Sequence, residues 1–186
     1  MIFGEIPVAD CAGVILAHSL RISKGVLKKG RVLTSEDAAA LAQAGFRTVV
    51  AARLEPGDVG ENDAASELAR AIACTAVAVG PAFTGRVNLL SEIPGLAVLD
   101  RAAIDRFNLV DETVTLATVE PYAQVQPRQM VATLKIIPFA APRSAVDKFS
   151  GLLATYAYRF QVCGVSMLTA PSPAGSGIGH RPWLGL

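Results

Sequence analysis

The sequence predicts an α+β fold, with a small β-rich N-terminal lobe followed by a mixed α/β lobe. Short segments rich in β-branched residues dominate the first part of the chain, and helical and strand-like segments alternate after it. The turn-forming stretch "EPGDVGEND" at 55–63 separates the two patterns. Because 186 residues suffice for one substantial core or two small ones, we expect domains over residues 1–57 and 58–168 and a flexible tail over 169–186.

The N-terminal lobe is expected to begin with a meander of short strands over 13–33, in which Gly25 and Gly30 stand where the chain would reverse. A cluster of basic residues lies on this meander and consists of Lys24, Lys28, Lys29 and Arg31. These side chains either guard an exposed hairpin edge against pairing or bind phosphate.

A helix is expected over 34–45. Thr34 is suited to its N-cap, Asp37 follows three residues later as in a capping box, and Gly45 stands where a helix commonly stops. A strand over 46–54 should complete the lobe.

The second lobe shows helical and strand patterns in turn. An irregular or partly stranded crossing is expected over 80–95. The apolar spacing otherwise predicts helices over 61–73, 100–112 and 142–156, and strands over 75–79, 96–100, 113–119, 129–142 and 158–170.

Charge and hydropathy exclude several classes of partner. Lys and Arg number 17 against 16 Asp and Glu, a net charge of +1, so no excess positive field exists to attract nucleic acid or an anionic membrane. No segment approaches the roughly 18–20 uninterrupted apolar residues of a membrane span, and the start "MIFGEIPVAD" does not resemble a secretory signal. We therefore expect a cytoplasmic protein that binds neither nucleic acid nor membrane.

Metal and redox chemistry are not indicated. Cys11, Cys74 and Cys163 are far apart, lie in apolar segments and form no CxxC pair, which favours buried thiols. His18 and His180 are too few and too scattered for a metal site.

No catalytic motif of fixed spacing is present. The chain contains no GxSxG, GxxxxGK[ST] or HExxH, and no GxGxxG that follows a strand. The catalytic residues, if there are any, are therefore unknown from sequence.

The segment "FTGRVN" is the clearest candidate for a binding site. It combines the Thr84 hydroxyl, the flexible backbone of Gly85, the Arg86 guanidinium and the Asn88 carboxamide directly after a strand. Gly85 would let a ligand approach the main chain, and Arg86 could bind a phosphate oxygen through two donors. These groups suit an anion with a polar ring, and the alternative is a turn with an exposed arginine.

Three further residues are weaker candidates. Asn108 and Asp111 lie at the expected end of a helix, where they could reach donors of a heterocycle or serve as caps and turn formers. Lys135 lies within the apolar "ATLKIIPF", so it must reach the sheet surface or meet an anion.

Several segments resemble one protein family. The stretch "GVILAHSLRISKGVLKKGRVLTSEDAAALAQAGFRTVVAARLEPGDV" resembles the molybdopterin molybdenumtransferases and their relatives. "FTGRVNL", "DRAAIDRFNLVDETVTLATV" and "QMVATLKIIPFA" look closer to a bacterial subgroup, in which a molybdopterin-binding region precedes a nucleotidyltransferase that makes the cytosine dinucleotide form of the cofactor. The resemblance covers roughly residues 1–168.

The resemblance implies molybdopterin as the ligand, with the phosphorylated pterin bound by Thr84, Gly85, Arg86, Asn88, Asn108, Asp111 and Lys135. The nucleotidyltransferase half, and with it the acids that would bind Mg²⁺, is absent from the chain. We therefore expect no activity from the chain alone, whereas a full-length relative would be a transferase. Expected partners are a nucleotidyltransferase domain or a molybdoenzyme, and the alternative function is a non-catalytic module that docks such a partner.

The C-terminal stretch "PSPAGSGIGHRPWLGL" has no periodicity and is rich in Pro, Gly and Ser, which is typical of a flexible arm. The strand expected before it would present an apolar segment that a following domain would cover. We expect self-association to cover it here, giving a homo-oligomer.

Overall fold

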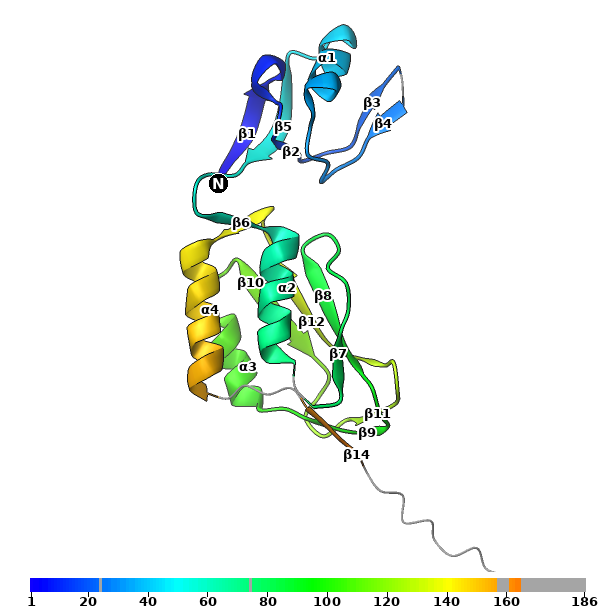
Figure 1. Cartoon of the computed structure of the whole chain (residues 1–186), viewed down its shortest axis with the longest axis vertical. Coiled ribbons are helices and arrows are strands. Elements are labelled where there is room, and N and C mark those ends of the chain that lie inside the picture. The colour runs from blue at the N-terminus through cyan, green and yellow to red at the C-terminus, as the bar shows by residue number, and fades with distance from the viewer. Residues whose placement is uncertain (24, 74, 157–160, 165–186) are drawn as a thin grey trace, which may run out of the picture.

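The computed structural model describes residues 1–23, 25–73, 75–156 and 161–164, and it confirms the α+β fold (Figure 1). Four helices and many short strands occur in this part of the chain, and the strands form several small sheets. No helix within the described ranges is long and apolar enough to cross a membrane.

The N-terminal elements form a three-stranded sheet and a separate hairpin, both built from short strands. The sheet has the order β1-β5-β2, and β3 pairs with β4. The elements are β1 (Ile2–Pro7), the 3-10 helix η1 (Val8–Asp10), β2 (Ile15–Leu16), β3 (Leu20–Ile22), β4 (Gly25–Leu27), α1 (Ser35–Gln43) and β5 (Thr48–Arg53). Their apolar side chains form one buried cluster, which includes Val14, Leu16, Leu33 and Leu41.

Helix α1 begins with the capping box that the sequence predicts. The Asp37 backbone N–H donates to the Thr34 hydroxyl at 3.2 Å, and the Thr34 N–H donates to the Asp37 carboxylate at 3.1 Å. The Arg31 guanidinium also donates twice to this carboxylate, at 2.7 and 3.1 Å. These hydrogen bonds lower the pKa of the buried Asp37, and the contribution of Arg31 is the largest.

The remaining elements form a second unit around a four-stranded sheet of order β10-β12-β8-β7. Helix α2 packs on β8 and β12, and α3 and α4 lie beside it (Figure 1). The elements are β6 (Asp58–Gly60), α2 (Glu61–Ile72), β7 (Val77–Val79), β8 (Arg86–Ser91), β9 (Gly95–Val98), α3 (Arg101–Asn108), β10 (Val114–Thr118), β11 (Gln124–Val125), β12 (Met130–Ile136), β13 (Ala140–Pro142), α4 (Arg143–Tyr156) and β14 (Gln161–Gly164).

This second unit has its own core. The rings of Phe107 on α3 and Phe149 on α4 lie 4.7 Å apart at its centre, and both are fully buried. The buried residues of the described chain thus fall into two clusters, one on each side of residues 54–57. The domain bounds of 1–57 and 58–168 stay a prediction, and the tail over 169–186 lies outside the described residues.

The structure adds detail to the sequence expectations in three places. In the turn-forming stretch 55–63, residues 58–60 form the short strand β6, and α2 starts at Glu61, where the helix expected over 61–73 begins. The crossing at 80–95 contains a regular strand, β8, which lies inside the sheet rather than at its edge. Every strand pair among the described residues is antiparallel, although only β3 with β4 and β7 with β8 are consecutive strands in the chain.

The expectation of buried thiols holds only in part. Cys11 is fully buried, and burial raises the pKa of its thiol. Cys163 is exposed, because it alternates with the buried Val162 on the edge strand β14. Cys74 lies outside the described residues.

We expect Asp37→Asn to lower the free energy of unfolding by about 1–2 kcal/mol near neutral pH, because it disrupts the capping box. The folded-state pKa of Asp37 is lowered, so its contribution is present above the unfolded pKa of about 4 and is lost as the pH falls through the folded pKa. Urea unfolding of wild type and variant should therefore differ near neutral pH and converge in acid.

Asp63→Asn is the matched control for this variant. Asp63 is exposed and occupies the corresponding position in the first turn of α2, where Gly60 provides no side-chain cap. An equal loss from both substitutions, or a loss from Asp37→Asn that does not depend on pH, would contradict the role given to the capping box.

Candidate functional site

The segment "FTGR" forms a two-residue hairpin turn between β7 and β8. Phe83 and Arg86 exchange backbone hydrogen bonds of 2.9 and 3.1 Å across it. The two central residues, Thr84 and Gly85, have positive φ angles of 47° and 71°, as in a type I′ turn. The turn therefore places the first residue of β8, Arg86, at one end of the sheet.

Gly85 is packed tightly against the start of α2 and the end of β12. Its N–H donates to the Asn62 side-chain oxygen at 2.9 Å, and its carbonyl accepts from the Ile136 N–H at 2.7 Å. A Cβ at this position would lie 2.7 Å from Glu61 Oε2 and 2.9 Å from the Ile136 carbonyl oxygen. The glycine is thus required both by its backbone conformation and by the space around it.

Arg86 and Lys135 lie directly opposite each other on the neighbouring strands β8 and β12. Like charges at opposed positions of an antiparallel pair are destabilising. No carboxylate in the described part of the chain forms an ion pair with either side chain. The sheet therefore carries an unbalanced pair of cations at this end.

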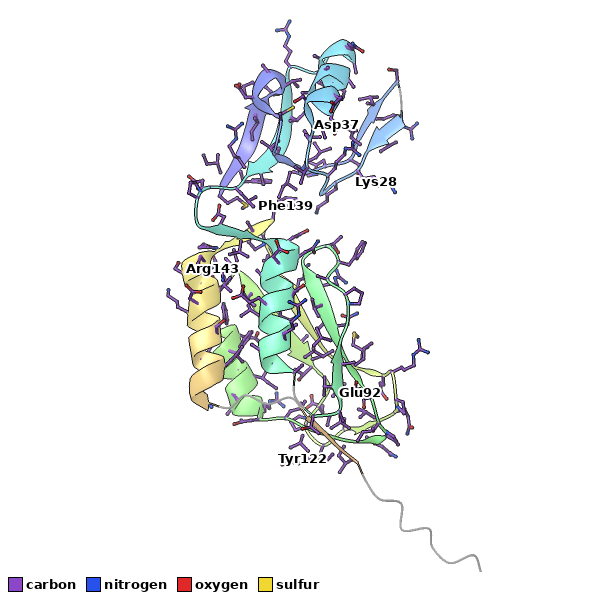
Figure 2. The ribbon with its side chains drawn as sticks, viewed as in Figure 1. Lys28, Asp37, Glu92, Tyr122, Phe139 and Arg143 are labelled. Atoms are coloured by element: carbon purple, nitrogen blue, oxygen red, sulfur yellow. The ribbon has the colours of Figure 1, made fainter. Side chains whose placement is uncertain are left out.

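The two cations line a cavity of about 740 Å³ at the junction between the N-terminal elements and the second unit. Figure 2 shows Phe139, one of the lining residues, at this junction. The cavity is bordered by Met1, Phe3, Lys29, Gly30, Glu61, Thr84, Arg86, Lys135, Ile136, Ile137, Pro138 and Phe139.

Positive charge exceeds negative charge among the side chains of the cavity. The lining contains three cationic side chains, Lys29, Arg86 and Lys135, and one carboxylate, that of Glu61. The Met1 ammonium group is already matched, because it pairs with Glu55 at 2.6 Å and with Asp58 at 2.8 Å. The cavity is therefore suited to an anion.

Glu61 is half-buried at the beginning of α2. Burial raises the pKa of its carboxyl group, and the nearby charges of Lys29 and Lys135 lower it by a smaller amount. Within the described ranges, its carboxylate has neither a hydrogen bond nor an ion pair.

Aromatic and aliphatic groups form the rest of the wall. The rings of Phe3 and Phe139 are stacked, with centroids 6.3 Å apart and planes inclined by 20°. Lys29 Nζ lies 5.7 Å from the centre of the Phe139 ring. Phe3 is 56% exposed, so it offers an accessible flat surface beside the cations.

The structure brings some of the predicted site residues together and separates others. Thr84, Arg86 and Lys135 line the cavity, and Gly85 forms the turn behind them. Asn88 is the next residue on the same face of β8, where it accepts a hydrogen bond from the Thr133 hydroxyl at 2.8 Å, but it does not line the cavity.

Asn108 and Asp111 serve local structure. The Asn108 side chain bonds both backbone groups of Leu116, at 2.7 and 2.9 Å, and so ties the end of α3 to β10. Asp111 accepts from the backbone and the hydroxyl of Thr113 at 3.0 and 2.8 Å. Neither residue lines the cavity, which agrees with the capping alternative for both.

Three residues of the cavity carry no sequence signal of a site: Phe3, Glu61 and Phe139. In the sequence, Glu61 is only one of several acids in a turn-forming stretch. Lys29 belongs to the basic cluster for which the sequence allows two roles, protection of a hairpin edge against pairing and the binding of phosphate. Its position favours the second, while Arg31 of the same cluster is bound to Asp37. In the part of the chain that the structure describes, no group of His, Cys, Asp and Glu could hold a metal ion.

Residues 5–53 match a family model described as "Domain of unknown function (DUF8806)". The match extends from β1 to the end of β5 and covers less than half of the chain. It contains Lys29, whereas Glu61, Arg86 and Lys135 lie beyond it. No curated protein matches the chain significantly.

We expect Gly85→Ala to destabilise the protein by about 2–4 kcal/mol, because the added Cβ combines a strained φ with close contacts to Glu61 and Ile136. Gly45→Ala is the matched control. Its φ of +85° is similar, but nothing lies within 4 Å of the added atom, so strain alone should cost about 1–2 kcal/mol. Equal losses for the two variants in chemical unfolding would show that the turn is not packed as described.

Proposed function

We propose that the chain binds a phosphorylated pterin of the molybdopterin type in the cavity between its N-terminal elements and its second unit. The observation that carries the proposal is the convergence of Lys29, Arg86 and Lys135 beside the stacked rings of Phe3 and Phe139. The resemblance of residues 1–168 to the molybdopterin-binding region of cofactor-biosynthesis proteins supports the same ligand. The proposal includes the cytoplasmic location and the self-association expected from the sequence.

The polar and the aromatic residues of the cavity would bind different parts of the ligand. A phosphate group needs cations and hydrogen-bond donors, which Arg86, Lys135 and the Thr84 hydroxyl provide. A planar heterocycle gains from stacking on an aromatic ring, which Phe3 and Phe139 offer. The volume of about 740 Å³ is within the range of small-molecule sites.

The phosphate would also relieve the repulsion between Arg86 and Lys135. Without a ligand, the opposed cations destabilise the pairing of β8 and β12. A dianion between them replaces that repulsion with two favourable contacts. A module that only docks another protein, which is the alternative function, does not require cations to converge on a recessed site.

We expect Arg86→Ala to weaken the binding of molybdopterin about tenfold or more, because it removes a charge-assisted contact to the phosphate. Titration of wild type and variant followed by the intrinsic fluorescence of the pterin measures the difference. Arg101→Ala is the matched control, since Arg101 is 72% exposed, pairs only loosely with Glu120 and does not line the cavity. Equal affinities of wild type and Arg86→Ala would sink the assignment of the site.

The chain alone is expected to be inactive as a cytidylyltransferase. Its sequence lacks a nucleotide-binding glycine loop and an acid cluster for Mg²⁺. Incubation with CTP, Mg²⁺ and molybdopterin should release no pyrophosphate. Release that depends on molybdopterin would show that the chain itself carries the transferase.

A further inference from the structure

Glu61 conflicts with a site that only binds phosphate. Its carboxylate lies in the same cavity as the cations and would repel a phosphate group. Lys29 and Lys135 are near enough to influence it, yet neither forms an ion pair with it in the described structure. A ligand that also carries hydrogen-bond donors would compensate for this repulsion.

The carboxylate has no partner of its own in the described structure, but the backbone that carries it is anchored to its surroundings. Oε2 lies against Gly85, where a Cβ would approach within 2.7 Å. The Glu61 backbone N–H donates to the Phe139 carbonyl at 3.0 Å, and the neighbouring Asn62 side chain accepts from the Gly85 N–H. The start of α2, the hairpin turn and the aromatic wall are therefore linked around this group.

We propose that Glu61 selects ligands that carry a 2-amino-4-oxopyrimidine ring, by accepting hydrogen bonds from the ring N–H and the adjacent amino group. The proposal rests on the function proposed above and specifies which heterocycle the site accepts. These two neighbouring donors match the two oxygens of one carboxylate, as a guanidinium does in a bidentate pair.

The position of Glu61 suits this role. A ring that stacks on Phe139 lies beside the start of α2, because the Glu61 N–H and the Phe139 carbonyl are hydrogen-bonded. The half-buried setting of the carboxyl group strengthens hydrogen bonds to it relative to an exposed acid. Arg86 and Lys135 remain available for the phosphate at the sheet end of the cavity.

Pterins and guanine both contain this ring edge. The binding of their monophosphates can therefore be compared to find which of the two heterocycles the site prefers. The probes are a pterin monophosphate, GMP, IMP, AMP and inorganic phosphate, each titrated calorimetrically into the full chain. IMP differs from GMP only by the missing amino group. We expect wild type to bind the pterin monophosphate and GMP about tenfold or more tightly than IMP or AMP. A pterin monophosphate that binds more tightly than GMP identifies the pterin as the preferred source.

Glu61→Gln should reduce the preference for GMP over IMP to about threefold or less, because one carboxamide position donates instead of accepting. The same variant should bind inorganic phosphate as well as wild type or better, since a repulsive charge is removed. A misfolded variant would lose the binding of both GMP and inorganic phosphate. A reduced preference for GMP together with unchanged or tighter phosphate binding therefore excludes misfolding as the explanation. Glu92→Gln is the control, because Glu92 is exposed and lies at the far end of the second unit from Phe139 (Figure 2).

The outcomes separate the two proposals. Equal binding of GMP, IMP and AMP by wild type, or an unchanged preference in Glu61→Gln, overturns the role of Glu61 and leaves the anion site intact. Failure of all the phosphorylated heterocycles to bind overturns the proposed function itself. The comparison of GMP with IMP on wild type is decisive even if the variant does not fold.

Discussion

The opposition of Arg86 and Lys135 across β8 and β12 is the constraint on which the site depends. Two cations at directly opposed positions of an antiparallel pair repel each other, and no acid in the described chain pairs with them. The strands nevertheless pair here because the apolar residues around them, such as Val87 and Leu134, are fully buried and hold the register. The core thus stabilises a charge arrangement that is unfavourable in the absence of a ligand. Such a local conflict with the general rules of stability is typical of binding sites.

Backbone hydrogen bonds and close packing fix the position of the strand end that carries Arg86. The type I′ turn at Thr84 and Gly85 fixes the start of β8, and its contacts with Asn62 and Ile136 join it to α2 and β12. The N-terminal elements contribute Lys29 and Phe3 from the other side of the cavity. A ligand held by both sides would therefore also link the two core clusters, so that binding and the relative position of the two units would be coupled.

Much of the local structure could be predicted from sequence, because short-range signals determine it. Thr34 and Asp37 give the capping box of α1, and Asp100 caps α3 by accepting from the Ala103 N–H. The polar segment "FTGRVN" marks Arg86, and the apolar segment "ATLKIIPF" marks the charge of Lys135 within it. Their direct opposition could not be predicted, because β8 and β12 are far apart in the sequence and no local signal sets the register between them. Glu61, Phe3 and Phe139 could not be predicted as site residues, because only the tertiary arrangement brings them to one cavity. Asn108 and Asp111 do not line this cavity, and hydrogen bonds to nearby backbone groups already satisfy their polar side chains.

The central claim is that the cations of the cavity serve a ligand and not the fold. Thermal unfolding of Lys135→Met, with and without a pterin monophosphate, tests it most directly. Without the ligand, we expect the variant to unfold at the same temperature as wild type or higher, because the substitution keeps the volume and removes the repulsion with Arg86. The ligand should raise the unfolding temperature of wild type far more than that of the variant. A variant that is less stable than wild type without ligand, and that gains as much as wild type when the ligand is added, would contradict the claim.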